Sequence, residues 1–523
     1  MTNNNGATRR TFLGAGGATL GGAALGLGLL GAETAEAGGK DKKKGGPPRL
    51  SLRPEYHHSV PDNWMNDPQR PLFVNGEYLY YYLYNADYIS GAGGTAWRLA
   101  TTKDNVTFRD RGVAIPKFTN ANGDIWSGCP VLDARGTAGY GKGAVVVIAT
   151  QAPEGRQAQY LWYSKDGGRS FKASSLAPVL PNPGVHDFRD PKIVWDGERR
   201  RWLLVLAEGH KIGFYASPNL KDWTYLSGFE RSDIGVLECP DIFQMTADDG
   251  SSHWILGVGA NGKGRGLPAT YAYWVGSFDG VAFATSQDEP QWLDWGYDFY
   301  GAVTYPHHDK RGKEDPRLRH ALGWANFWDY PHNAPTVYSD GYNGDNTIAR
   351  DVRLTRGNGD YYLASSPTAA LGDYVSKTHR LGTVALDGTR ELNVRAKAYE
   401  ITCELEWREG VQPNAGIEVR RAKEVGRHVA VGVYVPAPYA YVNRRPTFHP
   451  GPDESKTPFD TSSRTVRLRI LVDNTSVELF VNDGRHVHSN RVFHYPSDTG
   501  IRLYAYDGGA TFKDLTIREL KGR

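Results

Sequence analysis

EYLYYYLY, residues 77–84, contains only aromatic and aliphatic residues after its first glutamate, and such a run is a strong strand signal. AVVVIA at 144–149 and RWLLVL at 201–206 have the same character, and Gly, Asp and Asn separate such runs along the chain. Short runs rich in aromatic and β-branched residues, bounded by turn residues, are typical of strands. No long helical periodicity competes with them before the middle of the chain. The sequence therefore predicts an all-β protein.

A loose internal repeat predicts how these strands are grouped. A hydroxyl residue, a turn-forming residue and a nearby aromatic recur around Asp104, Asp166, Asn219 and Asp279. The spacing is roughly 50 to 60 residues, which suits propeller blades of four short strands. Hairpin tips use the same residues in many folds, so the repeat alone leaves the propeller and other β folds open.

A second all-β region is expected from about residue 377 to the end of the chain. Apolar and polar side chains alternate in residues 466–473 and 476–484, and the second run closes on the turn signal Asn-Asp-Gly. Such alternation is typical of an antiparallel sheet with one exposed face. We therefore predict a propeller over residues 51–370 and a β-sandwich over residues 377–523.

The first 37 residues are expected to be a twin-arginine signal peptide. TRRTFL at 8–13 carries the arginine pair, a Gly/Ala/Leu run continues to Leu30, and AEA at 35–37 suits a signal peptidase. The run is long enough to raise the question of a membrane anchor, but its glycine content favours an export signal. Residues 38–50 are expected to be a flexible linker. We predict a secreted, extracellular protein with no stable membrane anchor, exported by the twin-arginine machinery; a mature N-terminus carrying Arg9 would contradict this.

Composition excludes several classes of function. A length of 523 residues favours two domains, and a formal net charge of +3 argues against nucleic acid as the main partner. The 3 cysteines are scattered and lack metal-ligand spacing, so neither a disulfide framework nor a zinc site is expected. Most of the 30 Tyr and 14 Trp should pack in the core, and a few could stack on sugar rings.

Three short acidic motifs carry the chemistry: WMNDP at 64–68, FRDP at 188–191 and ECPD at 238–241. Cleavage of a glycosidic bond needs one carboxylate to attack the anomeric carbon and a second carboxyl group to protonate the leaving oxygen. Taken singly, each motif could be structural, as an Asx turn, an ion pair with the neighbouring arginine, or a strand end beside a turn. The apolar residues before ECPD would suit a carboxylic acid that holds a proton.

As a set and in this order, with DIWSG at 124–128 and DFYG at 298–301, the motifs resemble those of glycoside hydrolase family 32. That family contains invertases, inulinases, levanases and fructosyl-transferring enzymes. The resemblance runs from about Tyr56 to the C-terminus, because residues 469–484 also look like the family's sandwich domain. It implies a five-bladed β-propeller with a funnel-shaped site at its axis, followed by a β-sandwich.

The resemblance also implies roles for individual residues. Asp67 would be the nucleophile, Glu238 the acid/base, and Asp190 the stabiliser of the transition state. The substrate-binding residues that it implies are Asn66, Trp126, Ser127, Arg189, Tyr300 and Trp324. The implied mechanism is retaining, through a covalent fructosyl-enzyme, with the two reacting carboxyl groups about 5 to 5.5 Å apart. It needs no metal and no cofactor.

The chain departs from the commonest family pattern at a few positions. Gln69-Arg70 stands where Asn-Gly is usual, Leu83 where Gln is usual, and Cys129 where a second Ser often sits. These changes are expected to alter the pocket around the reacting sugar, which makes sucrose a doubtful substrate. We expect Arg70 near the mouth of the site and a polymeric fructan, levan or inulin, as the substrate.

Two other functions stay open on the sequence alone. The same site could serve a fructosyltransferase that releases difructose anhydride or an oligosaccharide, because a few pocket contacts decide between water and sugar as acceptor. A more distant possibility is a non-catalytic, carbohydrate-binding propeller, against which the retention of all three acids argues. Five-bladed glycosidases of arabinose polymers share the architecture but lack this series of motifs. The sandwich is expected to brace the propeller.

Overall fold

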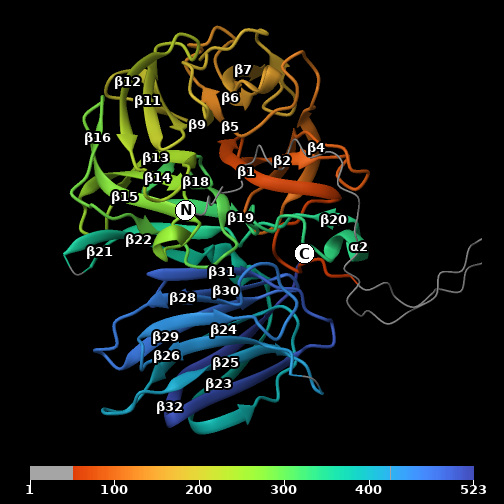
Figure 1. Ribbon diagram of the computed structural model, residues 1–523, viewed down its shortest axis with the longest axis vertical. Helices are drawn as coiled ribbons and strands as arrows, with labels where there is room; N and C mark the ends of the chain where they lie inside the picture. Colours follow the sequence, from red (N-terminus) through yellow and green to blue (C-terminus); the bar gives the residue numbers. More distant parts are fainter. Residues whose placement is uncertain (1–50, 358, 425, 523) are drawn as a thin grey trace, which may run out of the picture.

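The structure is a computed structural model, and it describes residues 51–357, 359–424 and 426–522. These residues form five small, mostly antiparallel sheets around a common centre, with a larger ten-stranded sheet beside them (Figure 1). The predicted all-β fold, a five-bladed propeller followed by a β-sandwich, is confirmed. The expected signal peptide, residues 1–37, and the expected linker, residues 38–50, lie outside the described residues.

The propeller blades follow one another along the chain. Blade 1 contains β1 (Asn63–Val74), β2 (Glu77–Asn85), β3 (Ala96–Thr102), β4 (Arg109–Ile115) and the late strand β20 (Tyr342–Asn343). Blade 2 contains β5 (Gly128–Asp133), β6 (Ala144–Gln151), β7 (Ala158–Ser164) and β8 (Lys172–Ala173). Blade 3 contains β9 (Arg189–Asp196), β10 (Arg201–Glu208), β11 (Lys211–Ser217) and β12 (Thr224–Glu230).

Blade 4 contains β13 (Glu238–Thr246), β14 (Ser252–Gly259), β15 (Tyr271–Phe278), β16 (Phe283–Ala284) and β17 (Gln291–Trp292). Blade 5 contains β18 (Tyr300–His308), β19 (Glu314–Trp324), β21 (Arg350–Gly357) and β22 (Asp360–Pro367). The short helices are η1 (Pro153–Gly155), η2 (Lys263–Arg265), α2 (Thr336–Asp340) and η3 (Ala369–Tyr374). Over the described ranges, no helix combines the length and apolar character needed to cross a membrane.

The innermost strands of the blades, β1, β5, β9, β13 and β18, contact one another in a closed ring, and their labels gather at the centre of the upper body in Figure 1. The ring is also tied at the edge of blade 1, where β20 pairs in parallel with β1. Each acidic motif therefore lies on an innermost strand, and residues distant in sequence meet at the axis.

The run at 77–84 lies in β2, and the packing of this strand explains why the run has no polar face. Leu79 and Tyr81 pack in a core shared with blade 2, whereas Tyr80 and Tyr82 pack in a core shared with blade 5. A strand between two packed sheets buries both of its faces, so its apolar residues form a continuous run and do not alternate with polar ones. The run at 201–206 in β10 is buried in the same way, between blades 2 and 4.

The internal repeat corresponds to equivalent hairpins. Asp104, Asp166, Asn219 and Asp279 each follow the third strand of blades 1 to 4. In each case a side-chain oxygen accepts hydrogen bonds from backbone N–H groups two to four residues further on. Such Asx contacts close a turn locally, which is why this residue type recurs once per blade.

The sandwich consists of β23 (Val375–Glu391), β24 (Tyr399–Glu406), β25 (Asn414–Arg421), β26 (Val429–Tyr434), β27 (Tyr439–Asn443), β28 (Glu454–Pro458), β29 (Thr465–Val472), β30 (Ser476–Val481), β31 (His486–Arg491) and β32 (Gly500–Leu520). The first part of β32 pairs with β25 and its last part with β24, so one strand belongs to both layers. Between these parts Gly508 and Gly509 have φ of 101° and 79°, values that glycine adopts without a steric cost. Side chains of both layers form a single core.

Buried ionic contacts fix the sandwich to the propeller. Asp298, which opens the DFYG motif, accepts hydrogen bonds from the Arg444 guanidinium at 2.8 Å and from the Arg491 backbone N–H at 2.7 Å. Both arginines belong to the sandwich and are fully buried. A buried charge is stable only when it is paired, so these contacts hold the loop that leads into β18. The sandwich thereby braces the strand that begins at Tyr300.

His57 forms a second buried link between the two domains. Its Nδ1 lies 2.9 Å from the Asp473 carboxylate and its Nε2 lies 3.0 Å from that of Glu478, both in the sandwich. Burial alone would lower the pKa of His57, but the hydrogen bonds and charges of the two carboxylates raise it from the ordinary 6.5 to about 9. The imidazolium therefore ties the segment before β1 to the sandwich.

This link predicts a pH-dependent stability. Because the pKa of His57 is higher in the folded chain, its stabilisation is fully present below pH 6.5 and is lost as pH rises through about 9. The change is worth about 3 kcal/mol of the free energy of unfolding. Denaturant titrations from pH 6 to 9.5 should show a steeper decline in the wild type than in His57→Gln. The exposed His210→Gln is the control; equal slopes in all three proteins would contradict the assignment.

Candidate active site

Asp67 lies in β1 with its carboxylate fully buried. Ser127 donates a hydrogen bond from Oγ to its Oδ2 at 2.9 Å, and Asn66 donates from Nδ2 to its Oδ1 at 3.2 Å. Asn66 is itself fixed by Trp64, whose indole N–H donates to its Oδ1 at 3.0 Å. Donors on both oxygens favour the ionised, nucleophilic form and hold it in one orientation.

Two neighbours of Asp67 set its position. Gly301 has a φ of 53°, and a Cβ there would lie 2.8 Å from the Asp67 Cγ, so only glycine leaves room for the carboxylate. Gln69 donates from its amide nitrogen to the Asp67 carbonyl at 3.0 Å and to the Ser127 Oγ at 3.3 Å. Its amide oxygen accepts from the Gly128 N–H at 2.7 Å. Gln69 thus ties β1 to the start of β5.

Asp190 and Cys239 meet across blades 3 and 4 in unusual backbone conformations. Their φ values are 64° and 49°, in the left-handed region that non-glycine residues rarely adopt. The Cys239 N–H donates to the Asp190 Oδ2 at 3.1 Å, and the Asp190 N–H donates to the Thr150 hydroxyl at 3.1 Å. The Cys239 sulfur lies 3.5 Å from the Asp190 carboxylate and 3.7 Å from that of Asp67. One thiol therefore contacts two of the three acids.

Glu238 is the first residue of β13. Its Oε1 accepts hydrogen bonds from the Arg189 Nε at 3.2 Å and Nη2 at 3.1 Å, and its Oε2 accepts from the Tyr300 hydroxyl at 2.6 Å. The Arg189 Nε also lies 4.0 Å from the Asp190 Oδ2, so one guanidinium contacts two acids. Leu237 packs in the core of blades 3 and 4. Polar groups therefore contact both oxygens of a carboxyl whose preceding residue is apolar and buried.

Arg189 is held from its other side. Its Nη1 forms an ion pair with Asp187 and donates to the amide oxygen of Gln157 at 3.4 Å. Burial would raise the pKa of Asp187, but the charge and hydrogen bond of Arg189, with a contact from His186, leave it below its ordinary value. Asp187 is therefore an anion that anchors the guanidinium at the position from which it reaches Glu238.

The two predicted tryptophans, Trp126 and Trp324, contact residues other than the three acids. The Trp126 indole N–H donates to Asp124 at 3.2 Å. Trp324 is fully buried and packs edge to face on Trp64 at 5.6 Å and against Trp328 at 5.0 Å. Direct hydrogen bonds to two of the acids, Asp67 and Glu238, come from the other four predicted binding residues, Asn66, Ser127, Arg189 and Tyr300.

The expectation that Arg70 lies near the mouth is wrong. Its side chain is buried, and it donates to the Gly128 carbonyl at 3.0 Å and to the Pro240 carbonyl at 2.7 Å. It therefore joins the innermost strands of blades 1, 2 and 4. Leu83 and Cys129 pack in apolar cores between blades. Of the departures from the family pattern, only Gln69 contacts groups that hold Asp67.

Four residues of the site were given no role from the sequence: Gln157, Asp187, Cys239 and Gly301. Gly301 carried a signal, since glycine directly after an aromatic at a strand start is typical of a close backbone approach. Gln157 and Cys239 act through hydrogen bonds between blades, which leave no local pattern in one sequence, whereas Asp187 contacts its sequence neighbours His186 and Arg189.

The arrangement offers two carboxylates in different settings around one centre. Asp67 accepts from neutral donors, whereas Glu238 is held by a cation and a phenol. Asp190 shares the Cys239 thiol with Asp67 and the Arg189 guanidinium with Glu238. This set can supply attack, proton donation and charge stabilisation to a single sugar. Within the described residues, no group of three or more His, Cys, Asp or Glu could hold a metal ion.

Comparisons with known proteins cover both domains. The family model described as "Glycosyl hydrolases family 32 N-terminal domain" matches residues 57–367, and "Glycosyl hydrolases family 32 C terminal" matches residues 370–519. The chain is 47% identical to the levanbiose-producing levanase of Bacillus subtilis (strain 168), over 91% of this chain and 93% of that protein.

Two fungal proteins extend the likeness. The chain is 28% identical to an extracellular exo-inulinase of Aspergillus niger, over 89% of this chain and 93% of that one. It also resembles the crystal structure of the exo-inulinase from Aspergillus awamori, with a TM-score of 0.80 and 26% identity, over 90% of this chain and 99% of that chain.

Proposed function

The chain belongs to glycosyl hydrolase family 32 and is a fructan-hydrolysing glycoside hydrolase, and from this premise we propose that it cuts levan and releases levanbiose. The observation that carries the choice of levan is the 47% identity with a levanbiose-producing levanase over 91% of the chain. The site geometry supports a hydrolase rather than a binding module, because a lectin has no use for a buried nucleophile beside a cation-held acid.

In the first chemical step, a carboxylate oxygen of Asp67 attacks C2 of the fructosyl unit. The bond from C2 to the glycosidic oxygen breaks, and Glu238 gives its proton to that oxygen, so that the remaining chain leaves as an alcohol. Arg189 and Tyr300 hold the Glu238 carboxyl at this position. The result is an ester between Asp67 and C2.

In the second step, Glu238 removes a proton from water, and the water oxygen attacks C2. The ester bond to Asp67 breaks, which restores both carboxyl groups. Asp190 binds hydroxyl groups of the reacting ring and strengthens these contacts as positive charge develops at C2. Two inversions at one carbon give net retention.

The test is product analysis after incubation with levan, inulin and sucrose separately. We expect levanbiose as the main early product from levan, and rates at least tenfold lower on inulin and sucrose. Release of a cyclic difructose would favour the transferase alternative. Absence of any sugar released from levan would contradict the proposal.

We also propose that the protein is exported through the twin-arginine pathway and acts outside the cell. The arginine pair at Arg9-Arg10 and the substrate's size support this, because a polymer must be cut before uptake. A relative is described as extracellular. Expression with Arg9→Lys and Arg10→Lys together should leave the precursor inside the cell. Unchanged secretion of that variant would contradict the pathway.

A further inference from the structure

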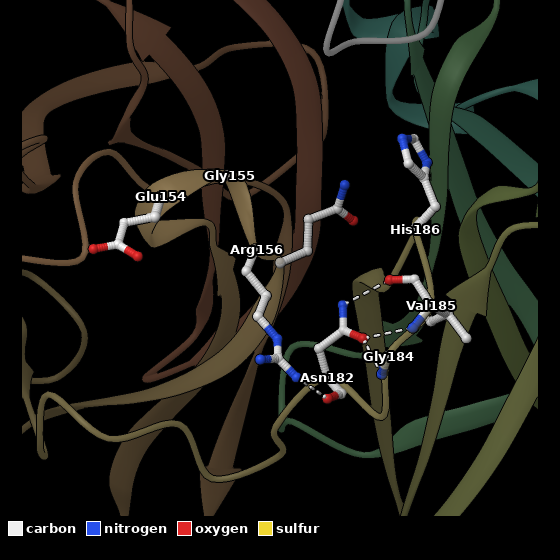
Figure 2. Close-up of a pocket in the computed structure, with 8 residues that line it drawn as sticks. Glu154, Gly155, Arg156, Asn182, Gly184, Val185 and His186 are labelled. Atoms are coloured by element: carbon white, nitrogen blue, oxygen red, sulfur yellow. Dashed lines mark hydrogen bonds between the residues drawn. The ribbon is translucent and has the colours of Figure 1, made fainter.

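A hollow of about 250 Å³ lies beside the site, between the η1 turn and the loop that leads into β9. Figure 2 shows Arg156 on one wall, the turn from Asn182 to Val185 on the other, and His186 above that turn. Glu154 lies further away, with its carboxylate directed away from these side chains (Figure 2). We call this hollow the β6–β9 pocket.

Gln157 lines the β6–β9 pocket and carries a donor that lacks a protein partner. The residue is 2% exposed, and its amide oxygen accepts from the Phe188 N–H at 2.8 Å and from the Arg189 Nη1 at 3.4 Å. These two donors fix which end of the amide is the oxygen. Among the described residues, no acceptor takes a hydrogen bond from its amide nitrogen. Because Gln157 lines the hollow, this nitrogen is available to donate to a ligand hydroxyl there.

The pocket is connected to Glu238 through side-chain contacts. His186 lies on its wall, and the His186 Nδ1 is 3.1 Å from Asp187. Asp187 pairs with Arg189, and Arg189 donates to the Glu238 Oε1. Gln157 reaches Arg189 directly as well. The pocket therefore lies on the side of the site where the proton donor is held.

The position of the proton donor decides which part of the substrate lies on this side. Glu238 gives its proton to the glycosidic oxygen, and the sugar that departs is attached to that oxygen. Asp67 must approach C2 from the opposite face, because displacement is in line. The departing part of the chain consequently starts near Glu238 and extends away from Asp67.

The groups in the pocket fit a neutral, hydroxyl-rich ring. Arg156 is fixed by a hydrogen bond from Nη2 to the Asn182 carbonyl at 3.0 Å, so its guanidinium forms part of a rigid wall. Asn182 stabilises its own turn by accepting from the N–H groups of Gly184 and Val185 at 2.8 and 2.9 Å. Val185 adds an apolar surface that is 40% exposed. Donors beside a small apolar surface are what a sugar ring with hydroxyls and C–H faces needs.

We propose that the β6–β9 pocket binds a fructosyl residue of the departing levan chain, with the Gln157 amide nitrogen donating to one of its hydroxyls. This inference rests on the proposed function, since it assigns a subsite to the same reaction. Binding energy from this remote residue positions the glycosidic oxygen at Glu238. The same pocket would hold the acceptor whenever a sugar replaces water.

The test fills the pocket and compares two leaving groups. Val185→Trp should occupy the hollow from its exposed wall, and it replaces none of the residues that hold Glu238. Arg156→Ala is a second variant, on the opposite wall. The control is Val281→Trp, because Val281 is also exposed, at 49%, and lies in the β15–β16 turn away from the pocket. Each protein is assayed for kcat/KM on levan and on p-nitrophenyl β-D-fructofuranoside, which has no departing sugar chain.

For Val185→Trp we expect about a tenfold loss of kcat/KM on levan, the size of one lost hydrogen bond and its packing, with the aryl fructoside little affected. Arg156→Ala should show a smaller loss in the same direction, and Val281→Trp none. Equal losses on both substrates, or no loss on levan, would overturn the proposal. A switch of the levan product from levanbiose to fructose would also overturn it, because the pocket would then hold the released sugar.

Failure of the proposed function has a different signature. In that case the wild type itself would release no sugar from levan, whatever the variants do. If the wild type cuts levan and Val185→Trp cuts it equally well, only the subsite proposal is contradicted.

Discussion

Asp67→Asn is expected to lower kcat on levan by about 10⁴-fold or more, because an amide does not form the ester with C2. The fold should persist. The asparagine oxygen still accepts the hydrogen bond from Ser127, and the substitution adds no atoms beside Gly301. Initial rates of sugar release, measured with a melting curve for each protein, check this prediction.

The matched control is Asp373→Asn, which removes an exposed carboxylate in η3, far along the chain from the three motifs. Its activity should equal that of the wild type. If Asp67→Asn also kept near-normal turnover while folded, Asp67 could not be the nucleophile.

Glu238→Gln is expected to lower kcat/KM on levan by about 10²- to 10⁴-fold, because the leaving alcohol then receives no proton. The amide can still accept from Arg189 and can donate to the Tyr300 hydroxyl, so its position should be kept. On p-nitrophenyl β-D-fructofuranoside the first step should be far less affected, since a nitrophenolate leaves without protonation. A pre-steady-state burst of nitrophenol measures that step.

The contrast between substrates is the diagnostic part of this prediction. An acid/base residue affects formation of the intermediate in proportion to the leaving group's need for a proton. If Glu238→Gln slowed the first step equally on levan and on the aryl fructoside, the residue would serve structure or binding instead.

The sequence was sufficient for the fold class, and it singled out three acids that the structure brings together. Runs such as 77–84 predicted strands, which the structure buries on both faces, and the turn residues around Asp104 and its equivalents marked the blades. These signals are local in the chain. The resemblance implied that the three motifs share one site, and in the structure each acid lies on an innermost strand, with Asn66 and Ser127 hydrogen-bonded to Asp67.

Side-chain directions could not be predicted, and Arg70 shows why. The pairing of β1 with β2 has irregularities between Met65 and Pro68 and again between Gln69 and Leu72. Each irregularity changes which face of the sheet the next side chain takes, so counting alternate residues from Asp67 fails. Arg70 accordingly points into the interior, where it joins three blades.

The contacts of Arg189 could not be predicted either. In sequence it is next to Asp190, but its hydrogen bonds go to Glu238 and Asp187. The left-handed backbone at Asp190 turns that carboxylate toward Cys239. The contacts of Arg189 with Glu238 and of Asp190 with Cys239 depend on how blade 3 packs against blade 4, and a short motif does not predict that packing.

The central claim is that Asp67 forms a covalent bond with the sugar while Glu238 handles the proton. Its most direct test is mass spectrometry of Glu238→Gln, quenched in acid after reaction with p-nitrophenyl β-D-fructofuranoside and then digested. We predict that the peptide containing Asp67 carries the added mass of one fructosyl residue, located on that side chain by fragmentation. A nitrophenol burst with the added mass on any other carboxyl group would contradict the account.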